Sequence, residues 1–318
     1  MKTLVYKTIV FALLSALFLC VLLASCTEKS GDADGEYFTF SDALGREVTL
    51  TEAPMRVASL LGSFADVWCL AGGTLCAAPE DAWEDFGLEL PEAVNLGGAH
   101  SPSLELLLSS DPDFVIASST VASNVEMRET LEALGISVAY FDVKNFDDYL
   151  RMLDICTTIT GRRDLYEANG TRLYEKIEAV KADFRASVPT EERKILLVRA
   201  SASSIKAKGS SGTVLGEMLS DIGCENIADS DSLILENLGA EAIIRENPYH
   251  IFVVTMGADT EAAISSFYGM INENPAWSTL DAVRCGRVHI MDKTLFNLKP
   301  NARWAESYER LYEEFTKD

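Results

Sequence analysis

Two glutamates occupy matching places in two similar segments of the chain. Glu105 lies seven residues before Pro112 in SLELLLSSDPDFVIAS, and Glu241 lies seven residues before Pro248 in LGAEAIIRENPYHIFVVT. In both segments an apolar strand pattern follows the proline. Both glutamates can be ordinary solvated residues near a helix N-terminus, where the helix dipole favours a carboxylate. Two exposed carboxylates on a rigid body can also each accept a bidentate pair from an arginine of a partner protein.

Cations gather in a few segments of the second half. The formal net charge of the chain is −22, which argues against nucleic acid and against adsorption to anionic lipid, because both need a cationic face. Within this acidic chain a local excess of cations suits an anionic ligand. The alternative is that Arg303 pairs with the neighbouring Glu306 and that the lysines are solvated. The cations concerned are Arg199, Lys206, Lys208, Lys299 and Arg303.

Enzyme signatures are missing from the sequence. GSSG at 209–212 is not a G-x-S-x-G nucleophile elbow, and there is neither a phosphate-binding loop nor an H-E-x-x-H motif. The segment GSSGTVLGEML can bind an anion through backbone N–H groups at a helix start, or it can be a tight turn. His100, His250 and His289 are too few and too scattered for a histidine-rich metal cage, and the last two fall in strand patterns that favour a structural role. We therefore expect a binding protein rather than an enzyme, with no catalytic residues, cofactor or metal site of its own.

The first 26 residues have the pattern of a secretory signal. Two early lysines precede an uncharged run at 9–24, which is short for a membrane-spanning helix. The sequence LASC ending at Cys26 resembles the lipobox of bacterial lipoproteins, and this resemblance implies diacylation of Cys26 and attachment to the outer face of a membrane. The alternative is an ordinary cleavage site with an incidental cysteine. Residues 1–25 are thus predicted to be a signal peptide, and the polar segment 26–36 a flexible tether.

Of the seven cysteines in the sequence, five lie beyond Cys26 and the Cys20 of the predicted signal, and these five are scattered along the chain. Their number is odd and none forms a C-x-x-C motif, so a disulfide framework is not expected. Buried free thiols are the main interpretation, although Cys69 and Cys76 could share a bridge. The five are Cys69, Cys76, Cys156, Cys224 and Cys285.

Alternating strand and helix patterns indicate parallel βαβ units. The first half is predicted to contain a hairpin at 37–50, strands at 56–61, 114–118 and 137–143, and helices at 63–71 and 123–134. The second half is predicted to contain strands at 194–200, 250–256 and 287–292, and helices at 213–222, 240–246, 261–271 and 302–315.

A long amphipathic helix is predicted between the two halves. From 164 to 186 there is no proline, only Gly170 interrupts, and apolar residues recur at three- and four-residue steps over about 34 Å. The predicted fold is two parallel-sheet α/β lobes joined by this helix, with a ligand cleft between them. Lobe 1 spans 37–145, the connecting helical segment 146–187, and lobe 2 188–318.

This layout resembles the helix-hinged solute-binding proteins of ABC importers, which capture ferric siderophores, haem or cobalamin. The matching pieces occur in family order over nearly the whole chain after the signal. They are DALGREVTL, RVASLL, PSLELLLSSDPDFVIAS, the long helix, GSSGTVLGEMLSDIGCENIAD, NPAWSTLDAVRCGRVHIMD and LFNLKPNARWAESYERLYEEF.

The resemblance implies a role for the paired glutamates. In this family one glutamate on each lobe docks onto arginines of the two membrane-spanning permease subunits, which work with an ATPase. By resemblance these are Glu105 and Glu241, with Glu236 as the fallback on the second lobe. The chain is then expected to be a monomer on the extracytoplasmic face of a cell membrane, at the cell surface or in the periplasm.

The ligand is expected between the lobes, where the carboxyl ends of parallel strands face each other. Family members often carry a Thr/Ser-Glu pair after the first strand, but this chain has GSFADVW with Asp66 in that place. The expected ligand contacts are Ser63, Phe64, Ser119 and Thr120 from the first lobe, and Arg199, Lys206, Met256, Phe296, Lys299 and Arg303 from the second.

A ferric siderophore is the first expectation for the ligand, with cobalamin and haem behind it. If the ligand is haem, His100 or Met256 is the candidate iron ligand. A second class is a sensor or scavenger that binds the same ligand without a transporter. A third is a surface enzyme of two α/β lobes, which the missing catalytic motifs disfavour.

Overall fold

The structure is a computed structural model that describes residues 37–257 and 259–317. These residues belong to one compact unit, and that unit is described here by itself. The predicted signal peptide, the lipidation site Cys26 and the tether at 26–36 lie outside the described residues.

Lobe 1 combines an N-terminal hairpin with a parallel sheet. The predicted hairpin is confirmed: β1 (Phe38–Ser41) pairs antiparallel with β2 (Glu47–Leu50). The sheet has the order β5-β4-β3-β6-β7 and all its pairs are parallel. Its strands are β3 (Val57–Ser59), β4 (Ala77–Ala78), β5 (Val94–Asn95), β6 (Phe114–Ser118) and β7 (Ser137–Phe141). Its helices are α2 (Gly62–Leu70), α3 (Asp81–Glu84), α4 (Leu104–Ser109), α5 (Ala122–Glu126) and α6 (Arg128–Ala133).

Lobe 2 contains a second sheet of the order β10-β8-β11-β12. The sheet was predicted to be parallel, and one additional strand departs from that prediction. The described strands on that path are parallel, but β9 pairs antiparallel with the end of β8. Its strands are β8 (Lys194–Ala200), β9 (Ile205–Lys208), β10 (Glu225–Asn226), β11 (His250–Thr255) and β12 (Val288–Met291). Its helices are α10 (Val214–Ile222), α11 (Ser232–Asn237), α12 (Ala240–Glu246), α13 (Thr260–Glu273), α14 (Asp281–Arg284) and α15 (Lys293–Phe296).

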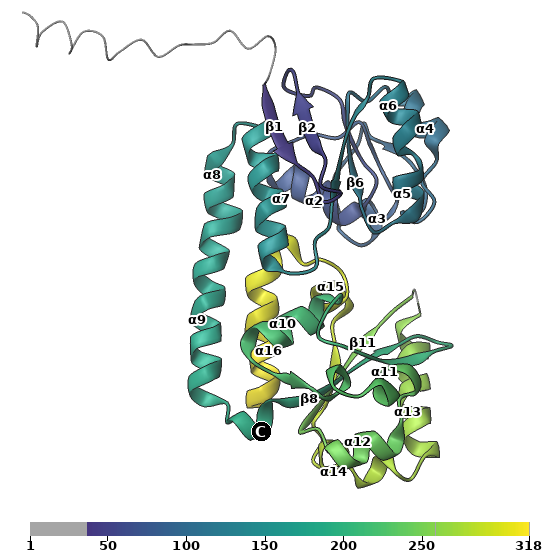
Figure 1. Ribbon diagram of the computed structural model, residues 1–318, viewed down its shortest axis with the longest axis vertical. Coiled ribbons are helices and arrows are strands. Elements are labelled where there is room, and N and C mark those ends of the chain that lie inside the picture. The colour runs from purple at the N-terminus through teal and green to yellow at the C-terminus, as the bar shows by residue number, and fades with distance from the viewer. Residues whose placement is uncertain (1–36, 258, 318) are drawn as a thin grey trace, which may run out of the picture. The chain divides into compact units, whose positions relative to one another are not determined.

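A helical segment connects the lobes, and it is less regular than the single α-helix predicted at 164–186. After α7 (Phe146–Ile159), the run Arg163–Ser187 consists of α8 (Arg163–Tyr166), a π-helical turn η1 (Glu167–Thr171) and α9 (Arg172–Ser187). The Arg172 N–H donates to the carbonyl of Glu167, five residues back, as in a π-helix. Figure 1 shows α8 and α9 passing beside both lobes.

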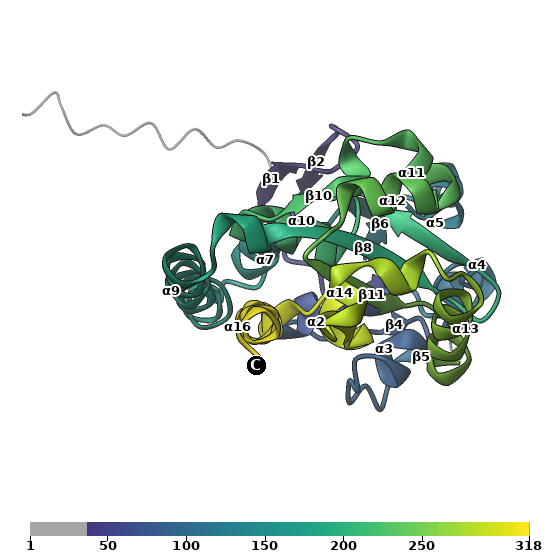
Figure 2. The same cartoon turned by 90° about the horizontal axis from the view of Figure 1, so that it is seen from below.

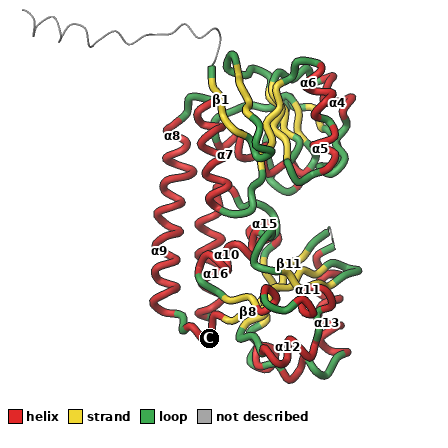
Figure 3. The backbone as a smooth tube through the Cα atoms, in the orientation of Figure 1, coloured by secondary structure: helices red, strands yellow, loops and turns green. Residues whose placement is uncertain are grey.

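The chain returns to lobe 1 before its last helix, α16 (Trp304–Thr316). Asn301, in the 3-10 turn η5 (Asn301–Arg303), donates from Nδ2 to the Ser63 carbonyl and to Asp66 Oδ2, both at 2.8 Å. The Trp304 ring then packs edge-on against Phe146 at a centroid distance of 5.9 Å. Both Figure 2 and Figure 3 show α16 alongside α9. One apolar cluster therefore runs from lobe 1 through these helices into lobe 2.

The described cysteines are all free, as the main interpretation expected, and Cys69 and Cys76 do not form a bridge. Cys156 is buried, and three others are half-buried. Cys285 is exposed, so the expectation that all five thiols are buried is wrong there, because Cys285 follows the short helix α14 in a surface turn. Within residues 37–257 and 259–317, no helix is long and apolar enough to cross a bilayer.

Candidate functional site

Three cations share one face of the lobe 2 sheet at its carboxyl edge. The β8–β9 register places Arg199 opposite Lys206 and Leu197 opposite Lys208. Because side chains alternate between the faces of a strand, Arg199, Lys206 and Lys208 project on the same side. We call these three residues the cation face. The sequence patterns do not reveal it, because the four-residue segment IKAK that forms β9 is too short and too polar to give a strand signal.

Acidic partners are missing from the cation face. Among the residues that the structure describes, no carboxylate lies within ion-pair distance of Arg199, Lys206 or Lys208, and the buried Nε of Arg199 has no hydrogen-bond partner. Burial lowers the pKa of Arg199, and burial together with the charges of Arg199 and Lys206 lowers the pKa of Lys208. Unpaired cations that repel one another in a chain of net charge −22 are suited to an anion.

Two backbone N–H groups of the adjacent GSSG turn, those of Ser210 and Gly212, are already bound by protein carboxylates. Asp229 accepts hydrogen bonds from the N–H and the hydroxyl of Ser210, at 2.8 and 2.6 Å. Glu217 accepts from the Gly212 N–H at 3.0 Å, and the Thr213 side chain caps α10. Protein carboxylates already occupy these donors. The segment is therefore a tight turn, which was the second of the two interpretations.

A junction pocket of about 210 Å³ lies where lobe 1 meets the segment 294–303. Its polar lining includes Asp66 and Asp85 from lobe 1 and Thr294, Lys299 and Arg303 from the returning chain. Burial raises the pKa of Asp66, and the hydrogen bond from Asn301 opposes part of that shift. The predicted residues Lys299 and Arg303 are thus brought together with Asp66, the position that departs from the family pattern.

Lys299 is a half-buried ammonium at this junction. Its Nζ lies 5.6 Å from the centre of the Phe64 ring, which is a cation–π distance. Burial lowers its pKa, while the charges of Asp142 and Asp81 raise it. No described carboxylate pairs with Lys299 directly: Asp142 instead binds Lys144 at 2.5 Å. Asp81 accepts from the Gly62 N–H at 3.1 Å, and this close approach needs glycine, because a Cβ at position 62 would lie 2.7 Å from Asp81.

The other predicted contacts differ in their accessibility. Ser63, Phe64 and Phe296 are each under 5% exposed, so they belong to the core rather than to an accessible surface, which argues against direct contact with a ligand. Ser119 is half-buried and Thr120 exposed, directly after β6. Met256 is 45% exposed, and its N–H binds the Ala200 carbonyl beside the end of β8.

Arg303 is exposed and forms a bidentate pair with Glu306, at 2.7 and 3.0 Å. The interpretation that Arg303 pairs with its neighbour is therefore the one that the contacts favour. The sequence patterns missed Asp81, since β4, which positions it, is only two residues long.

The matched glutamates occupy equivalent places in the two lobes. Glu105 is in the first turn of α4 and Glu241 in the first turn of α12, and both are exposed. Glu236, the fallback, is exposed on α11. None of the three forms an ion pair with another described residue, so all are available to a partner.

One of the three histidines lies at the surface, and the other two belong to a buried row of hydrogen bonds. His100 is exposed, whereas His250 Nδ1 lies 2.9 Å from His289 Nε2, and His289 Nδ1 lies 3.0 Å from Glu314 Oε2. Because the Glu314 carboxylate accepts, the ring of His289 donates from Nδ1 and accepts at Nε2 from the Nδ1–H of the His250 ring. The buried Nε2 of His250 is then left without a partner. These contacts fit the structural role expected of both residues. Across the described part of the chain, no group of three or more His, Cys, Asp or Glu could hold a metal ion.

A family match decides the class of protein. The sequence profile of the periplasmic binding proteins matches residues 57–295. The chain belongs to the periplasmic binding protein family. Members of this family are solute-binding proteins rather than enzymes, and the two parallel-sheet α/β lobes of this member agree with the fold of its structural neighbours.

Several relatives resemble this periplasmic binding protein over nearly its whole length. The uncharacterised ABC transporter substrate-binding lipoprotein YvrC of Bacillus subtilis is 23% identical over 315 residues, which cover 95% of each chain. The Fe(3+)-citrate-binding protein YfmC of the same organism is 24% identical over 307 residues, 91% of each chain. The solved structure of Staphylococcus aureus SirA complexed with staphyloferrin B has a TM-score of 0.69 at 20% identity, covering 88% of this chain and 99% of that one.

Proposed function

We propose that this chain is the extracytoplasmic binding component of an ABC importer and that it captures an anionic ferric complex, most simply a ferric siderophore. The observation that carries the ligand class is the cation face, Arg199, Lys206 and Lys208, whose members have no acidic partner among the described residues. Ferric complexes of citrate and of related carboxylate chelators are anionic and present several oxygen acceptors. Guanidinium and ammonium groups bind such acceptors well.

The ligands of two relatives support the same ligand class. One curated relative is an Fe(3+)-citrate-binding protein, and one structural neighbour was solved with staphyloferrin B. Other neighbours bind haem or vitamin B12. Haem and cobalamin therefore stay as alternative ligands, and His100 or Met256 is the candidate haem-iron ligand in that case.

The proposed binding site lies between the lobes. Arg199, Lys206 and Met256 would contact the ligand from lobe 2, Ser119 from lobe 1, and Lys299 and Arg303 from the junction. The buried residues Ser63, Phe64 and Phe296 would shape the wall. Lys299 would add a fourth cation, since it has no direct acidic partner among the residues described.

Delivery would use the paired glutamates and a lipid anchor. Glu105 and Glu241 are exposed in the first turns of equivalent helices, where two arginines of a permease can reach them. The partners would be the membrane-spanning permease subunits with their ATPase. Diacylation of Cys26 would hold the chain, as a monomer, on the extracytoplasmic face of the membrane.

The ligand is tested by titrating the purified chain with ferric citrate, haemin and cyanocobalamin while following tryptophan fluorescence and visible absorption. We expect ferric citrate, or another ferric carboxylate chelate, to bind most tightly and to weaken as salt is added, because salt screens the exposed part of the cation face. Tightest binding of haemin or cyanocobalamin, or binding of the ferric chelates that salt does not affect, would contradict the proposed ligand class.

A sensor or scavenger would bind the same ligand but would need no permease. Co-purification from membranes of the native host separates the two functions. An importer should bring its permease and ATPase subunits with it, and a Glu105→Ala/Glu241→Ala double variant should lose them while still binding ligand.

A further inference from the structure

Exposed large apolar side chains are concentrated on the helices that carry the matched glutamates. Among the described residues, eleven such side chains are exposed. Four of them belong to α4, α11 and α12, although each of these helices has only six or seven residues. Single apolar residues scattered over a surface are normal, whereas their concentration on a few elements indicates an interaction surface. The four are Leu106, Leu233, Leu235 and Ile244.

One of these apolar side chains accompanies the glutamate of each lobe. Leu106 directly follows Glu105 on α4 and is 41% exposed, so both side chains lie on the solvent-facing side of this six-residue helix. Ile244 lies three residues after Glu241 on α12, on the same side of that helix, and is 38% exposed. We call Leu106 and Ile244 the flanking residues. Each lobe thus presents a carboxylate with a large apolar side chain beside it.

The cores of the lobes do not need the flanking residues. Leu107 and Ile243 each lie two residues after the glutamate of their lobe, and they are 0% and 1% exposed. These two side chains belong to the apolar clusters that hold α4 and α12 to the rest of their lobes. The fold therefore gives no reason for a large apolar residue at position 106 or 244.

The carboxylate of lobe 2 is not neutralised, although an arginine lies on the same helix. Arg245 comes four residues after Glu241, where the two side chains can pair. Its guanidinium instead binds Asp231 at 2.7 Å and Glu246 at 3.4 Å. Glu105 also has no ion pair with a described residue. Each lobe therefore offers an uncompensated negative charge next to an apolar group, which is complementary to a cation set among apolar side chains.

We infer that the flanking residues are part of the permease interface, and that each permease subunit contacts them with apolar side chains placed around its docking arginine. Such an interface presupposes the proposed docking of Glu105 and Glu241. Contact between apolar side chains excludes water from the arginine–carboxylate pair, and a charged hydrogen bond is stronger where water is excluded. Salt screens such a shielded pair much less than an exposed one. The glutamates thus supply the charge, and the flanking residues make docking resistant to salt.

The test compares the purified chain with two double variants of the flanking residues. Leu106→Gln with Ile244→Gln removes the apolar groups but keeps good helix formers of similar size at both positions. Leu106→Met with Ile244→Met changes the shape of the side chains and keeps them apolar. Circular dichroism shows that both variants are folded.

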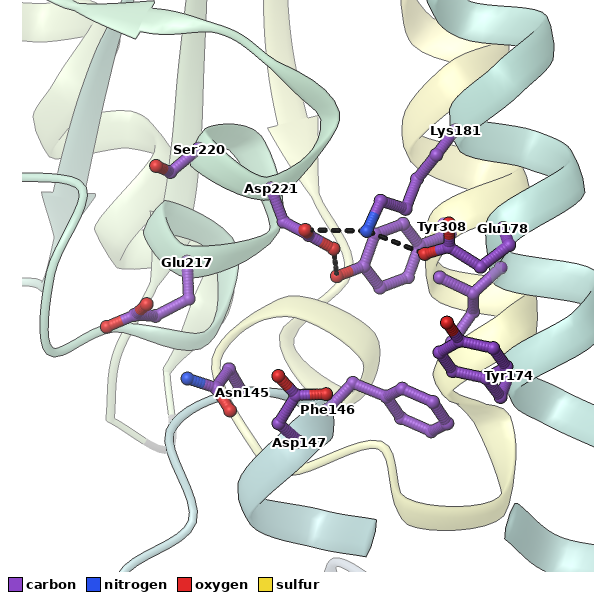
Figure 4. A pocket seen from close by; sticks show the side chains of 11 residues that line it. Asn145, Phe146, Asp147, Tyr174, Glu178, Lys181, Glu217, Ser220, Asp221 and Tyr308 are labelled. Atoms are coloured by element: carbon purple, nitrogen blue, oxygen red, sulfur yellow. Dashed lines mark hydrogen bonds and ion pairs between the residues drawn. The ribbon is translucent and has the colours of Figure 1, made fainter. Parts of the chain in front are cut away.

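The matched control is Leu44→Gln with Tyr174→Gln, which changes two apolar side chains of similar exposure, 37% and 48%. Leu44 is in the hairpin beside β7, where the Ala43 N–H donates to the Tyr140 carbonyl, whereas α4 begins next to β5 at the opposite edge of the sheet. Tyr174, on α9, lines a pocket of about 270 Å³ together with residues of α7 and α10 (Figure 4).

Surface plasmon resonance measures binding to the detergent-purified permease–ATPase complex of the native host, at about 0.1 M and 0.5 M sodium chloride. Leu106→Gln with Ile244→Gln should bind about tenfold more weakly, because two half-exposed apolar side chains no longer gain from burial. This variant should also lose more affinity than the parent when salt is added. The methionine variant and the control should match the parent.

Glu105→Ala with Glu241→Ala separates a failure of the inference from a failure of the proposed docking. If this variant loses binding while Leu106→Gln with Ile244→Gln binds like the parent at both salt concentrations, the inference is wrong and the docking role stands. If the glutamate variant binds like the parent, or the parent does not bind, both are wrong.

A second copy of this chain is the other occupant that the flanking residues could contact. Sedimentation equilibrium of the parent tests this, and we expect a monomer. A dimer that dissociates in Leu106→Gln with Ile244→Gln would overturn the inference.

Discussion

At the scale of single residues, the cation face predicts how ligand binding responds to charge. Replacing Arg199 with Met removes a half-buried guanidinium that no described carboxylate neutralises. Removing one partner of a desolvated charge pair costs about 2 kcal/mol or more, so affinity for ferric citrate should fall about 30-fold or more. Isothermal titration calorimetry measures this.

Lys176→Met is the matched control, because it removes one exposed cation from α9, away from the cation face. Its affinity should equal the parent's. Equal losses in the two variants would show that net charge, and not the cation face, attracts the ligand.

The buried pair His250 and His289 predicts that the free energy of unfolding decreases as the pH is lowered. Burial lowers the pKa of His250 to about 3 and also lowers the pKa of His289, despite the neighbouring Glu314. In the unfolded chain both would titrate near the ordinary value of about 6.5, so below that pH the unfolded state binds more protons than the folded one. Stability is therefore fully present above about pH 6.5 and decreases as the pH falls toward the folded-state pKa values.

Thermal unfolding at pH 7.5 and pH 5 measures this loss. His250→Phe removes one of the two groups from an environment of aromatic rings, in which Phe315 lies 4.6 Å away. The variant should show a smaller drop in melting temperature between the two pH values than the parent. A drop of equal size would show that other groups cause the acid sensitivity.

The sequence anticipated the types of residue at the site better than their arrangement. Arg199, Lys206 and Lys299 were named because they are cations in an acidic chain, and charge is visible without a structure. The cation face depends on the antiparallel pairing of β9 with β8, which a segment rich in serine and lysine does not indicate. The burial of Phe64 and Phe296 depends on the return of the chain to lobe 1, which joins residues more than 200 positions apart.

At the scale of elements, the π-helical turn predicts a specific loss of stability. Tyr149→Phe removes the hydroxyl that donates to the Asn169 carbonyl and so deletes one hydrogen bond between α7 and the π-helical turn. A typical intramolecular hydrogen bond contributes about 0.5–1.5 kcal/mol. The melting temperature should fall by several degrees, measured by circular dichroism.

Tyr174→Phe is the control for this variant. Tyr174 is on α9 and 48% exposed, and its hydroxyl has no hydrogen-bond partner among the residues described. Its melting temperature should stay within about one degree of the parent's, because surface substitutions usually have small effects. A similar fall in both variants would argue against a special role for the Tyr149 contact.

Element boundaries were predictable where the apolar pattern was long. β8 at 194–200 and α12 at 240–246 coincide with the predicted ranges. The π-helical turn was not predictable, because it arises from contacts of Asn169 and Gly170 with α7 and α2 rather than from local propensity. The two-residue strands β4 and β5 are also too short to give a periodic signal.

At the scale of the whole molecule, the exposed glutamates predict a separation of transport from binding. If Glu105 and Glu241 are the docking residues, as proposed, Glu105→Ala with Glu241→Ala should abolish uptake of the iron complex by cells, because each lobe would lose its bidentate acceptor for a permease arginine. Affinity of the purified chain for the complex should be unchanged. Uptake of a radiolabelled iron complex and calorimetry of the purified variant measure the two quantities.

Glu129→Ala with Glu261→Ala is the matched control, since it removes one exposed helix glutamate from each lobe at other positions. Uptake by this variant should equal that of the parent. If uptake persisted in the Glu105 and Glu241 variant, the docking hypothesis for this pair would be wrong. Glu236 on α11 would then be tested next.

The returning segment at 297–303 has a consequence for any attempt to divide the protein. Asn301 supplies hydrogen bonds to α2, and Trp304 covers Phe146, although both come from the last 20 residues of the sequence. A fragment that ends after α7 would expose Phe146 and the groups of α2 that Asn301 binds, and it should aggregate when expressed alone. Co-expression with the remainder of the chain should restore the solubility of the fragment. The two lobes would then depend on each other for folding and would not be independent domains.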